Sequence, residues 1–534
     1  MTTLAGQAEN VGGFSARSLN WTSALQFVLL LLVDGLGGWL ALSIGGDGNW
    51  FFAIAILFTL TVVSVIVLVP RLWPIKWISP ALALMIILSV YPMVYTLYIA
   101  FTNFSDGHRL TKIESVELLA DRRYLPEGGN TFSWTAFTNE AGAYALWLTN
   151  EAGESFFALP GTDFETVTPN QSGSAPYNED GVPASFNGFT VLEGGARFRA
   201  LTDLQALTFG NASSAVGIQS MQQAGEFQEQ WTYDSATDAL TDNATGTVYA
   251  ANNTTGEFVA PNGSTAPLGF WVGVGFDNFA RIIASSITEG PLLRVILWTV
   301  GFALGSSLSG FALGLLSALL LNGTSWWLRA TRALLIIPYA VPGLVSALVW
   351  RGMLNGNVGV ISTTMENLFG WAPPFSTDPG WAKFAILLVN LWFAAPYFML
   401  IGSGALQSIS SSVYEAAVVD GANQWIQFWK ITLPLVLVSL GPLLIASFIF
   451  NFNNFFIMEA LFQGGPPMAG TSAPPVGHTD NLISYTYRLA FSAGGTKDFG
   501  LAAALGVIIF MVVGALTLVQ FRITRTWEEV SESV

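Results

Sequence analysis

The sequence predicts an all-α polytopic membrane protein of about eight transmembrane helices that carries one mostly β, extracytoplasmic inserted domain. Three observations lead to this prediction. Of the 534 residues, 52% are hydrophobic and only 10% are charged, whereas soluble domains carry about a quarter charged residues. Long apolar runs recur along the chain, and a polar segment as long as a domain separates the third run from the fourth.

The apolar runs are long enough to cross a bilayer, because an apolar core about 30 Å thick takes roughly 20 helical residues. Eight runs reach about this length: 24–44, 50–69, 80–101, 295–321, 334–354, 384–406, 435–457 and 501–521. Asp34 lies in the first run. Pro338 and Pro342 lie in the fifth run and Pro396 in the sixth. Proline lacks a backbone donor, so we expect a kink or break at these positions.

The distribution of positive charge predicts the orientation of the chain. Lysine and arginine follow the even-numbered runs, at Arg71, Lys76, Arg329, Arg332, Lys430, Arg522 and Arg525. The opposite short connections are poorer in positive charge, although Arg488 and Lys497 lie there. The positive-inside rule therefore places both termini in the cytoplasm. We expect an N-terminal membrane region over 1–101, an external domain over 102–290, and a core membrane domain over 291–534 with a cytoplasmic loop at 407–434.

The external domain accounts for the acidity of the chain. Residues 106–289 hold 22 acidic and 7 basic side chains, and their net charge of −15 equals the formal net charge of the whole chain. The remainder is neutral, so no basic surface is available to bind nucleic acid. The segments 131–137, 144–148, 189–192 and 197–201 mix aromatic and branched residues between turn residues, which favours β-strands. The carboxylates either keep this domain solvated or steer a protein partner.

Several kinds of chemistry are disfavoured by composition. The chain has no cysteine, and its two histidines, His108 and His478, are far apart in the sequence. A Cys-ligated metal, a disulfide or a His-based catalytic triad is therefore not expected. The phosphate-binding pattern G-x-x-x-x-G-K-[ST] does not occur, so we expect ATP to act on another subunit. A membrane-anchored enzyme would need an acid/base pair in the external domain, and the sequence singles out none.

The seventh run carries unusually polar residues. Ser447, Asn451 and Asn454 fall at i, i+4 and i+7, with Phe450 beside them, so a continuous helix would place them on one face. Amides without partners in hydrocarbon cost several kcal/mol, so this face must meet another helix or a hydrated cavity. One interpretation is a site for a sugar or polyol, with Phe450 and Tyr397 offering apolar planes to the ring. The other is hydrogen bonding between helices.

Residues 415–434, EAAVVDGANQWIQFWKITLP, contain a known signature. The residues Glu415, Ala416, Ala417, Gly421, Ile431, Leu433 and Pro434 reproduce the EAA-x3-G-x9-I-x-LP pattern of ABC-type importer permeases, with both spacings intact. The strings IIPYAVP, SFIFNFNNF, GGP, TDNLISYTYRLAF and DFGLAAA follow in the order seen in the larger permease subunits of maltose/maltodextrin importers. The chain resembles that family from the third run to the eighth.

This resemblance implies an ABC type I importer permease in a bacterial cytoplasmic membrane. It implies sugar contacts at Ser447, Phe450, Asn451, Asn454 and Tyr397, and docking of the segment around Glu415 on an ATPase. The implied partners are a second, paralogous permease, two ABC ATPases that use ATP and Mg²⁺, and an extracytoplasmic maltodextrin-binding protein that the inserted domain contacts. No cofactor or metal is expected on this chain itself, which would be a transport subunit rather than an enzyme.

Two alternatives stay open. The family has a serine where this chain has Gly343, and Leu-Gly-Tyr where it has Phe393, Ala394 and Ala395, so the cargo could be another sugar or a polyol. An ion-coupled secondary transporter would need charged groups inside the membrane. Asp34 and Arg351 are the charged residues within the eight runs.

Overall fold

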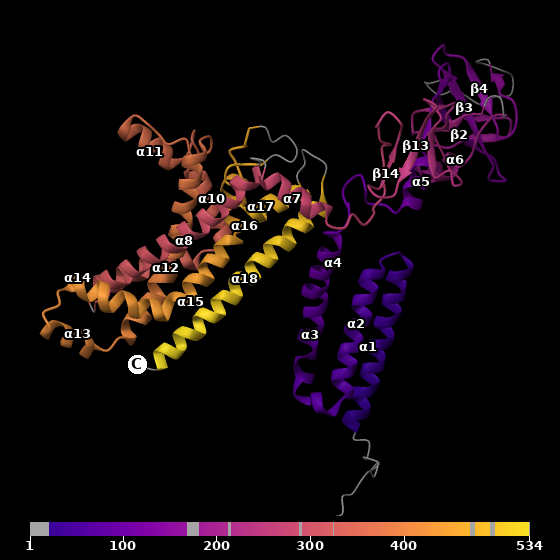
Figure 1. Ribbon diagram of the computed structural model, residues 1–534. Helices are drawn as coiled ribbons and strands as arrows, with labels where there is room; N and C mark the ends of the chain where they lie inside the picture. Colours follow the sequence, from indigo (N-terminus) through magenta and orange to yellow (C-terminus); the bar gives the residue numbers. More distant parts are fainter. Residues whose placement is uncertain are drawn as a thin grey trace, which may run out of the picture. The chain divides into compact units, whose positions relative to one another are not determined.

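The computed structural model describes residues 21–167, 181–211, 215–287, 291–323, 325–469, 476–491 and 497–532. The chain divides into two compact units. One unit, the membrane unit, comprises Met1–Thr102 and Gly275–Val534, and the other, the inserted unit, comprises Asn103–Val274. In Figure 1 the first unit is helical, and the second contains the β-strands.

The N-terminal part of the membrane unit begins with a helical hairpin of α1 (Trp21–Gly46) and α2 (Trp50–Leu68). A Cβ atom built at Gly37 of α1 would lie 2.9 Å from the Leu60 side chain of α2, so glycine allows these helices to approach closely. The third span, Pro74–Ile99, consists of the end of a 3₁₀ segment (Pro70–Ile78), α3 (Ser79–Met85), a π-helical turn (Ile86–Val90) and α4 (Tyr91–Ile99).

The C-terminal part of the membrane unit is a bundle of longer and shorter helices (Figure 1). They are α8 (Pro291–Leu320), α9 (Trp326–Ala340), α10 (Gly343–Met353), α11 (Val360–Phe369), α12 (Pro379–Ser408), α13 (Ser411–Val419), α14 (Gln424–Gln427), α15 (Leu433–Phe452), α16 (Phe455–Phe462), α17 (Leu482–Phe491) and α18 (Phe499–Glu532). The helices α8 and α12 pack closely, because a Cβ atom at Gly314 of α8 would lie 2.3 Å from that of Phe398. Phe398 is fully enclosed in this packing.

Within the described residues, seven helical segments are long and apolar enough to cross a membrane, and α9 with α10 would make an eighth span. The expected break in the fifth run is confirmed, because α9 and α10 meet at 97°. Pro396, in contrast, does not interrupt α12, which runs from Pro379 to Ser408. The expected seventh span over 435–457 is also wrong at its end. It stops at Phe452, and α16 begins as a separate helix at Phe455.

The inserted unit contains three sheets within its described residues. The first runs in the order β5 (Glu165–Val167), β4 (Ser155–Ala158), β3 (Tyr144–Asn150), β2 (Thr131–Thr138), β7 (Phe189–Val191) and β6 (Ser185–Phe186), with β9 (Ala224–Gly225) on β2 and β8 (Gly217–Ile218) on β9. The second is a meander of β11 (Trp231–Asp234), β12 (Ala239–Asp242), β13 (Thr247–Asn252) and β14 (Glu257–Val259). The third pairs β1 (Arg123–Tyr124) with β10 (Gln228–Glu229).

Two helices accompany these sheets, α5 (Lys112–Ala120) and α6 (Gly195–Gln205). The strand expected at 197–201 is therefore wrong, because this segment lies in α6. The helix buries Ala200 and Leu204, which are four residues apart and share one helical face. The segment 197–201 does not show this helical spacing by itself, because Leu204, the second of the two buried residues, lies beyond its end.

The expected boundary of the external domain at 290 is also corrected. The inserted unit ends at Val274, and α7 (Asp277–Ile287) belongs to the membrane unit. The amide of Asn278 donates to the carbonyl oxygens of Ala100 (3.0 Å) and Thr102 (2.8 Å), just past the end of α4. Helix ends leave carbonyls without partners, so these two bonds hold α7 against α4.

Candidate functional site: a cavity in the helical core

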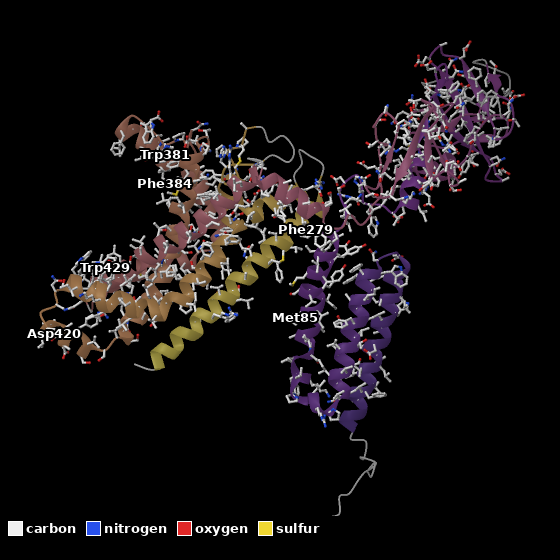
Figure 2. All side chains as sticks on the ribbon, in the orientation of Figure 1. Met85, Phe279, Trp381, Phe384, Asp420 and Trp429 are labelled. Carbon is white, nitrogen blue, oxygen red and sulfur yellow. The ribbon has the colours of Figure 1, made fainter. Side chains whose placement is uncertain are left out.

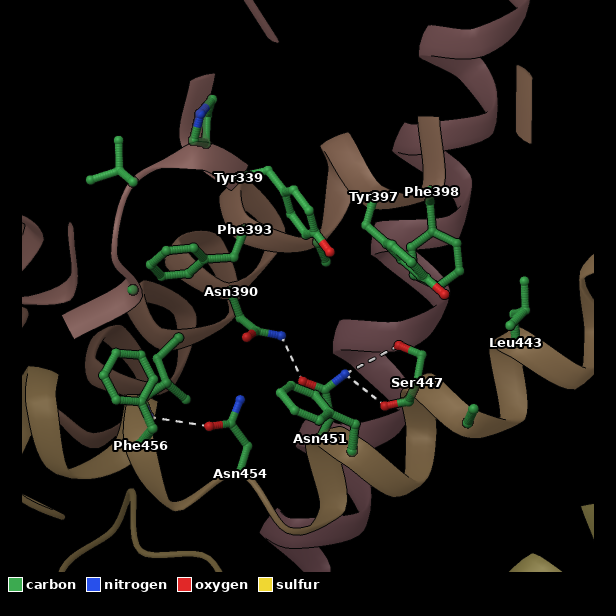
Figure 3. Close-up of a pocket in the computed structure, with 17 residues that line it drawn as sticks. Tyr339, Asn390, Phe393, Tyr397, Phe398, Leu443, Ser447, Asn451, Asn454 and Phe456 are labelled. Atoms are coloured by element: carbon green, nitrogen blue, oxygen red, sulfur yellow. Dashed lines mark hydrogen bonds between the residues drawn. The ribbon is translucent and has the colours of Figure 1, made fainter. Parts of the chain in front are cut away.

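A cavity of about 740 Å³ lies among helices α9, α10, α12, α15 and α16 (Figure 3). This volume falls within the usual range for small-molecule sites. Its lining residues are Pro338, Tyr339, Val341, Gly343, Asn390, Phe393, Ala394, Tyr397, Phe398, Leu443, Ala446, Ser447, Phe450, Asn451, Asn454, Phe456 and Ile457. No Asp, Glu, Lys, Arg or His is among them. The lining combines aromatic rings with amides and hydroxyls, so it suits an uncharged ligand.

The structure brings all five residues expected at a sugar site to this cavity: Ser447, Phe450, Asn451, Asn454 and Tyr397. The expectation that one continuous helical face brings them together is partly wrong, however. Ser447 and Asn451 share α15, but Asn454 follows the end of α15 and caps α16, where its Oδ1 accepts a hydrogen bond from the Ile457 amide at 3.2 Å. The break in the helix, rather than an i+7 spacing, places Asn454 at the cavity.

Asn451 joins three helices through its side chain. Its Oδ1 accepts from Nδ2 of Asn390 on α12 at 2.9 Å. Its Nδ2 donates to the backbone oxygen of Ser447 at 2.9 Å and lies 3.4 Å from the hydroxyls of Ser447 and of Ser307 on α8. Both polar atoms of Asn451 therefore have protein partners, and the residue is almost completely buried (Figure 3).

Asn390 and Ser307 were not predicted from the sequence. Asn390 is the one amide within the run 384–406, and this is a signal that could have found it. Ser307 is one of several serines in the run 295–321, so the sequence does not single it out. Asn390 also lines the cavity, whereas Ser307 lies behind Ser447 and Asn451.

Some polar atoms at the cavity are left for a ligand. Nδ2 of Asn454, Oδ1 of Asn390 and the hydroxyls of Tyr339 and Tyr397 have no hydrogen-bond partner within the part of the chain that the structure describes. The rings of Tyr339 and Tyr397 stack with centroids 6.4 Å apart. Phe450 is 71% exposed. Amides and hydroxyls that both donate and accept, beside flat apolar rings, match a polyhydroxylated ring compound.

The bend between α9 and α10 forms one wall of the cavity. The α9 helix ends at Ala340, and Val341 and Pro342 have extended backbone before α10 begins. Pro342 cannot donate to an earlier carbonyl, which explains why the helix does not continue. Non-helical backbone inside a membrane is tolerated where protein or a cavity surrounds it, and Val341 lines the cavity. The bend thereby turns Tyr339, in the last turn of α9, toward Tyr397.

The segment that carries the EAA signature forms a short helix at one end of the bundle, near the labelled Asp420 and Trp429 in Figure 2. Glu415 and Ala416 lie exposed on α13, whereas Ala417 is buried. Gly421 has a φ of +80°, a left-handed conformation that costs glycine little, and it ends the helix. Glu415 is thus available to a partner surface.

The expected loop at 407–434 is shorter than predicted. Helix α12 extends to Ser408, and Gln424–Phe452 forms one continuous helical segment. That segment consists of α14, a π-helical turn (Phe428–Thr432) and α15. Ile431, Leu433 and Pro434 therefore belong to the start of a membrane span, so the EAA helix α13 is the separate element between two spans.

Comparisons with known proteins identify the family. A family model described as "Binding-protein-dependent transport system inner membrane component" matches residues 310–525. A second, "N-terminal of TM subunit in PBP-dependent ABC transporters", matches residues 83–158. The "Maltose/maltodextrin transport system permease protein MalF" of Yersinia pestis is 33% identical over 516 residues, which are 95% of each chain. The chain belongs to the MalF family.

Other MalF proteins match this chain with similar sequence identity over a similar share of its length. That of Escherichia coli (strain K12) is 34% identical over 95% of this chain and 98% of its own. That of Vibrio parahaemolyticus is 32% identical over 95% of both chains. A solved bacterial ABC transporter chain, from a system that imports the acidic polysaccharide alginate, is 23% identical over 47% of this chain and 84% of its own, with a TM-score of 0.40.

Membership in the MalF family settles the class of the protein. It has the fold of an ABC type I importer permease, it crosses the membrane several times, and it is a transport component rather than an enzyme. Permeases of this class work in complexes with a binding protein and ATPases.

Proposed function

We propose that this chain is the permease subunit through which maltose/maltodextrin-type oligosaccharides cross the bacterial cytoplasmic membrane in an ATP-driven importer. The observation that carries the proposal is the cavity between α9, α10, α12, α15 and α16. Its lining is uncharged and aromatic, with unpaired groups on Asn390, Asn454, Tyr339 and Tyr397. Such a lining can hold sugar hydroxyls by hydrogen bonds and the C–H face of a sugar ring on an aromatic plane.

The proposed complex contains a second, MalG-like permease, two ABC ATPases and an extracytoplasmic maltodextrin-binding protein. ATP and Mg²⁺ act at the ATPases. Both termini and the EAA helix α13 are cytoplasmic in this arrangement, and the unit Asn103–Val274 lies outside. The support is the positive charge that follows the even-numbered spans, including Lys430 at the foot of α15. The inserted unit is proposed to contact the binding protein.

In the proposed mechanism, closure of the ATPases moves α13 and the start of α15 together. Because α15 carries Ser447 and Asn451, the movement changes the cavity wall and switches access from outside to inside. Transport in one direction requires that the two states differ in affinity for the sugar. The hydrogen bonds of Asn451 to α8 and α12 are the contacts that such a movement would rearrange.

Two alternatives remain as outcomes of the test. Gly343, Phe393 and Ala394 line the cavity at positions where the family pattern differs, so another sugar or a polyol could be preferred. An ion-coupled transporter receives little support. Asp34, its carboxylate candidate, accepts a hydrogen bond from Ser64 at 2.7 Å within the α1–α2 hairpin and does not line the cavity.

The proposal is tested by copurifying the complex and measuring uptake of labelled malto-oligosaccharides into proteoliposomes. We expect uptake to require both ATP and the binding protein. Uptake driven by an ion gradient without any ATPase would overturn the proposal. Uptake of a polyol or another sugar in preference to malto-oligosaccharides would assign a different cargo to the same kind of importer.

A further inference from the structure

We infer that Asn481, a buried residue just before α17 and outside the cavity lining, is a positioning residue that sets where Asn454 presents its free amide to the sugar. This inference rests on the proposed function of the cavity. Asn454 lies in the break between α15 and α16. Asn454 caps α16 through its Oδ1, which leaves Nδ2 beside the cavity (Figure 3).

A cap alone does not fix the position of Asn454. Residues in a break between helices have no continuous ladder of backbone hydrogen bonds to hold them. The additional contact comes from Asn481, whose Nδ2 donates to the backbone oxygen of Asn454 at 2.9 Å. This bond is buried, and both of its partners are shielded from solvent. It ties the backbone at the cavity to the start of another helix.

Asn481 is itself held in place by a reciprocal pair of bonds. Its amide nitrogen donates to Oγ of Ser484 at 3.0 Å, and the amide nitrogen of Ser484 donates to Oδ1 of Asn481 at 3.0 Å. This is the pattern of a capping box, in which both orphan donors at a helix start are satisfied. With Oδ1 engaged in the cap, the geometry directs Nδ2 of Asn481 to Asn454.

A buried ion pair anchors this cap. Asp480 is completely buried, and its Oδ1 accepts from Oγ of Ser484 at 2.8 Å. Both carboxylate oxygens accept from Nε of Arg488 at 2.9 Å, and Nη2 of Arg488 reaches Glu459 of α16 at 3.2 Å. A buried charge is tolerated only when it is paired and hydrogen-bonded. The network therefore holds the start of α17 and the body of α16 in one arrangement.

Helix α8 fixes the same region from the other side. Oγ of Thr299 accepts from the amide nitrogen of Leu482 at 2.9 Å, and Nε1 of Trp298 donates to the oxygen of Thr479 at 3.1 Å. Thr479 and Leu482, which lie on either side of Asn481 in the sequence, are thus both hydrogen-bonded to α8. The position of Asn454 is set by this assembly, although none of its members other than Asn454 lines the cavity.

The test separates positioning from simple stabilisation. Asn481→Ser retains an oxygen that can cap α17 but lacks the amide that reaches Asn454. Purified complexes, trapped with ATP and vanadate in the presence of the binding protein and radiolabelled maltose, would be assayed for sugar retained per complex. Loss of one hydrogen bond corresponds to a change of about twofold to tenfold. We expect retention to fall by that factor while the complex assembles normally.

A double variant gives the decisive comparison. If Asn481 acts through Asn454, Asn454→Ala combined with Asn481→Ser should retain as much sugar as Asn454→Ala alone, because coupled residues are not additive. Independent, multiplicative losses would overturn the inference, as would full retention by Asn481→Ser. Should Asn481→Ser fail to assemble, Asn481→Thr, which also caps a helix, replaces it. Failure of the parent complex to retain maltose would instead count against the proposed function.

Discussion

The hydroxyl of Tyr414 on α13 lies 3.0 Å from the hydroxyl of Thr432, which ends the π-helical turn at the foot of α15. This bond joins the exposed EAA helix to the span that carries Ser447 and Asn451. Thr432 is buried and Tyr414 is half-buried, so the contact is partly shielded from water. A π-helical turn places one extra residue in a helical turn and often marks a functional position. The pair is therefore a direct connection between the helix that we propose to face the ATPase and the span that forms part of the cavity wall.

Tyr414→Phe removes this bond and leaves the ring. We expect the ATP hydrolysed per sugar imported to rise about twofold to tenfold, because one partly shielded hydrogen bond contributes about 1 kcal/mol. The measurement is ATP hydrolysis and sugar uptake in the same proteoliposomes. Thr432→Val should give the same change, and the double variant should be no worse than either single variant. An unchanged ratio in all three would show that the bond plays no part in coupling.

The left-handed conformation of Gly421 predicts a second effect on coupling. A Cβ atom at this position would meet nothing within 4 Å, so the cost of Gly421→Ala comes from the backbone alone. That cost is about 1 kcal/mol. We expect Gly421→Ala to lower ATP hydrolysis stimulated by the binding protein. Asparagine tolerates this conformation, so Gly421→Asn is the matched control and should retain more activity than alanine. Equal loss in both would assign the effect to the side chain.

The exposed position of Glu415 predicts that it acts on a partner and not on the fold. We expect Glu415→Gln to reduce ATPase stimulation while leaving the thermal stability of the purified permease unchanged within about 0.5 kcal/mol, as is usual for surface substitutions. Stimulation of ATP hydrolysis and the midpoint of thermal unfolding are the two measurements. A loss of stability together with stimulation would mean that Glu415 supports α13 itself.

The bond between Asn390 and Asn451 predicts coupled energies. Asn390→Leu or Asn451→Leu leaves a buried amide without its partner, which costs about 1–3 kcal/mol. The double variant removes both amides, so its loss should be smaller than the sum by about 0.5–2 kcal/mol. The midpoint of thermal unfolding of the purified permease tests this prediction. Sugar uptake should be lost in all three variants. Strict additivity would mean that the two amides stabilise the protein independently.

The inserted unit should lose stability in acid through Asp238. Its hydrogen bond from Lys112, supported by bonds from Tyr233 and Asn253, lowers the pKa of the Asp238 carboxyl. A carboxyl with a lowered pKa in the folded state stabilises the fold above about pH 4, its unfolded value. That stability is lost as the pH falls through the lower, folded value. The protection of amides in β11 and β12 against hydrogen exchange, taken relative to the intrinsic exchange rate at each pH, should therefore fall at low pH, and less so in Asp238→Asn. An equal pH dependence in both proteins would contradict this.

The sequence was sufficient for features that depend on local pattern. Apolar length located the membrane spans, because a backbone in lipid must satisfy its own hydrogen bonds as a helix. The EAA signature from Glu415 to Pro434 was recognised by its exact spacing. The paired prolines Pro338 and Pro342 predicted the broken fifth span. The five cavity residues were also named from sequence, although for Asn454 the expected helical face was the wrong reason.

Tertiary structure decided what no local pattern contains. At the break, the backbone oxygen of Asn454 is bonded by Asn481, which is 27 residues further along the chain, and apolar periodicity cannot report a partner at that distance. The same holds for Asn390 and Ser307, whose roles appear only when α8, α12 and α15 meet at Asn451. The inserted unit ends at Val274, and just beyond it Asn278 bonds to the end of α4, more than 170 residues earlier. Hydropathy thus determined which segments enter the membrane, and buried hydrogen bonds between distant residues determined where those segments break and what they enclose.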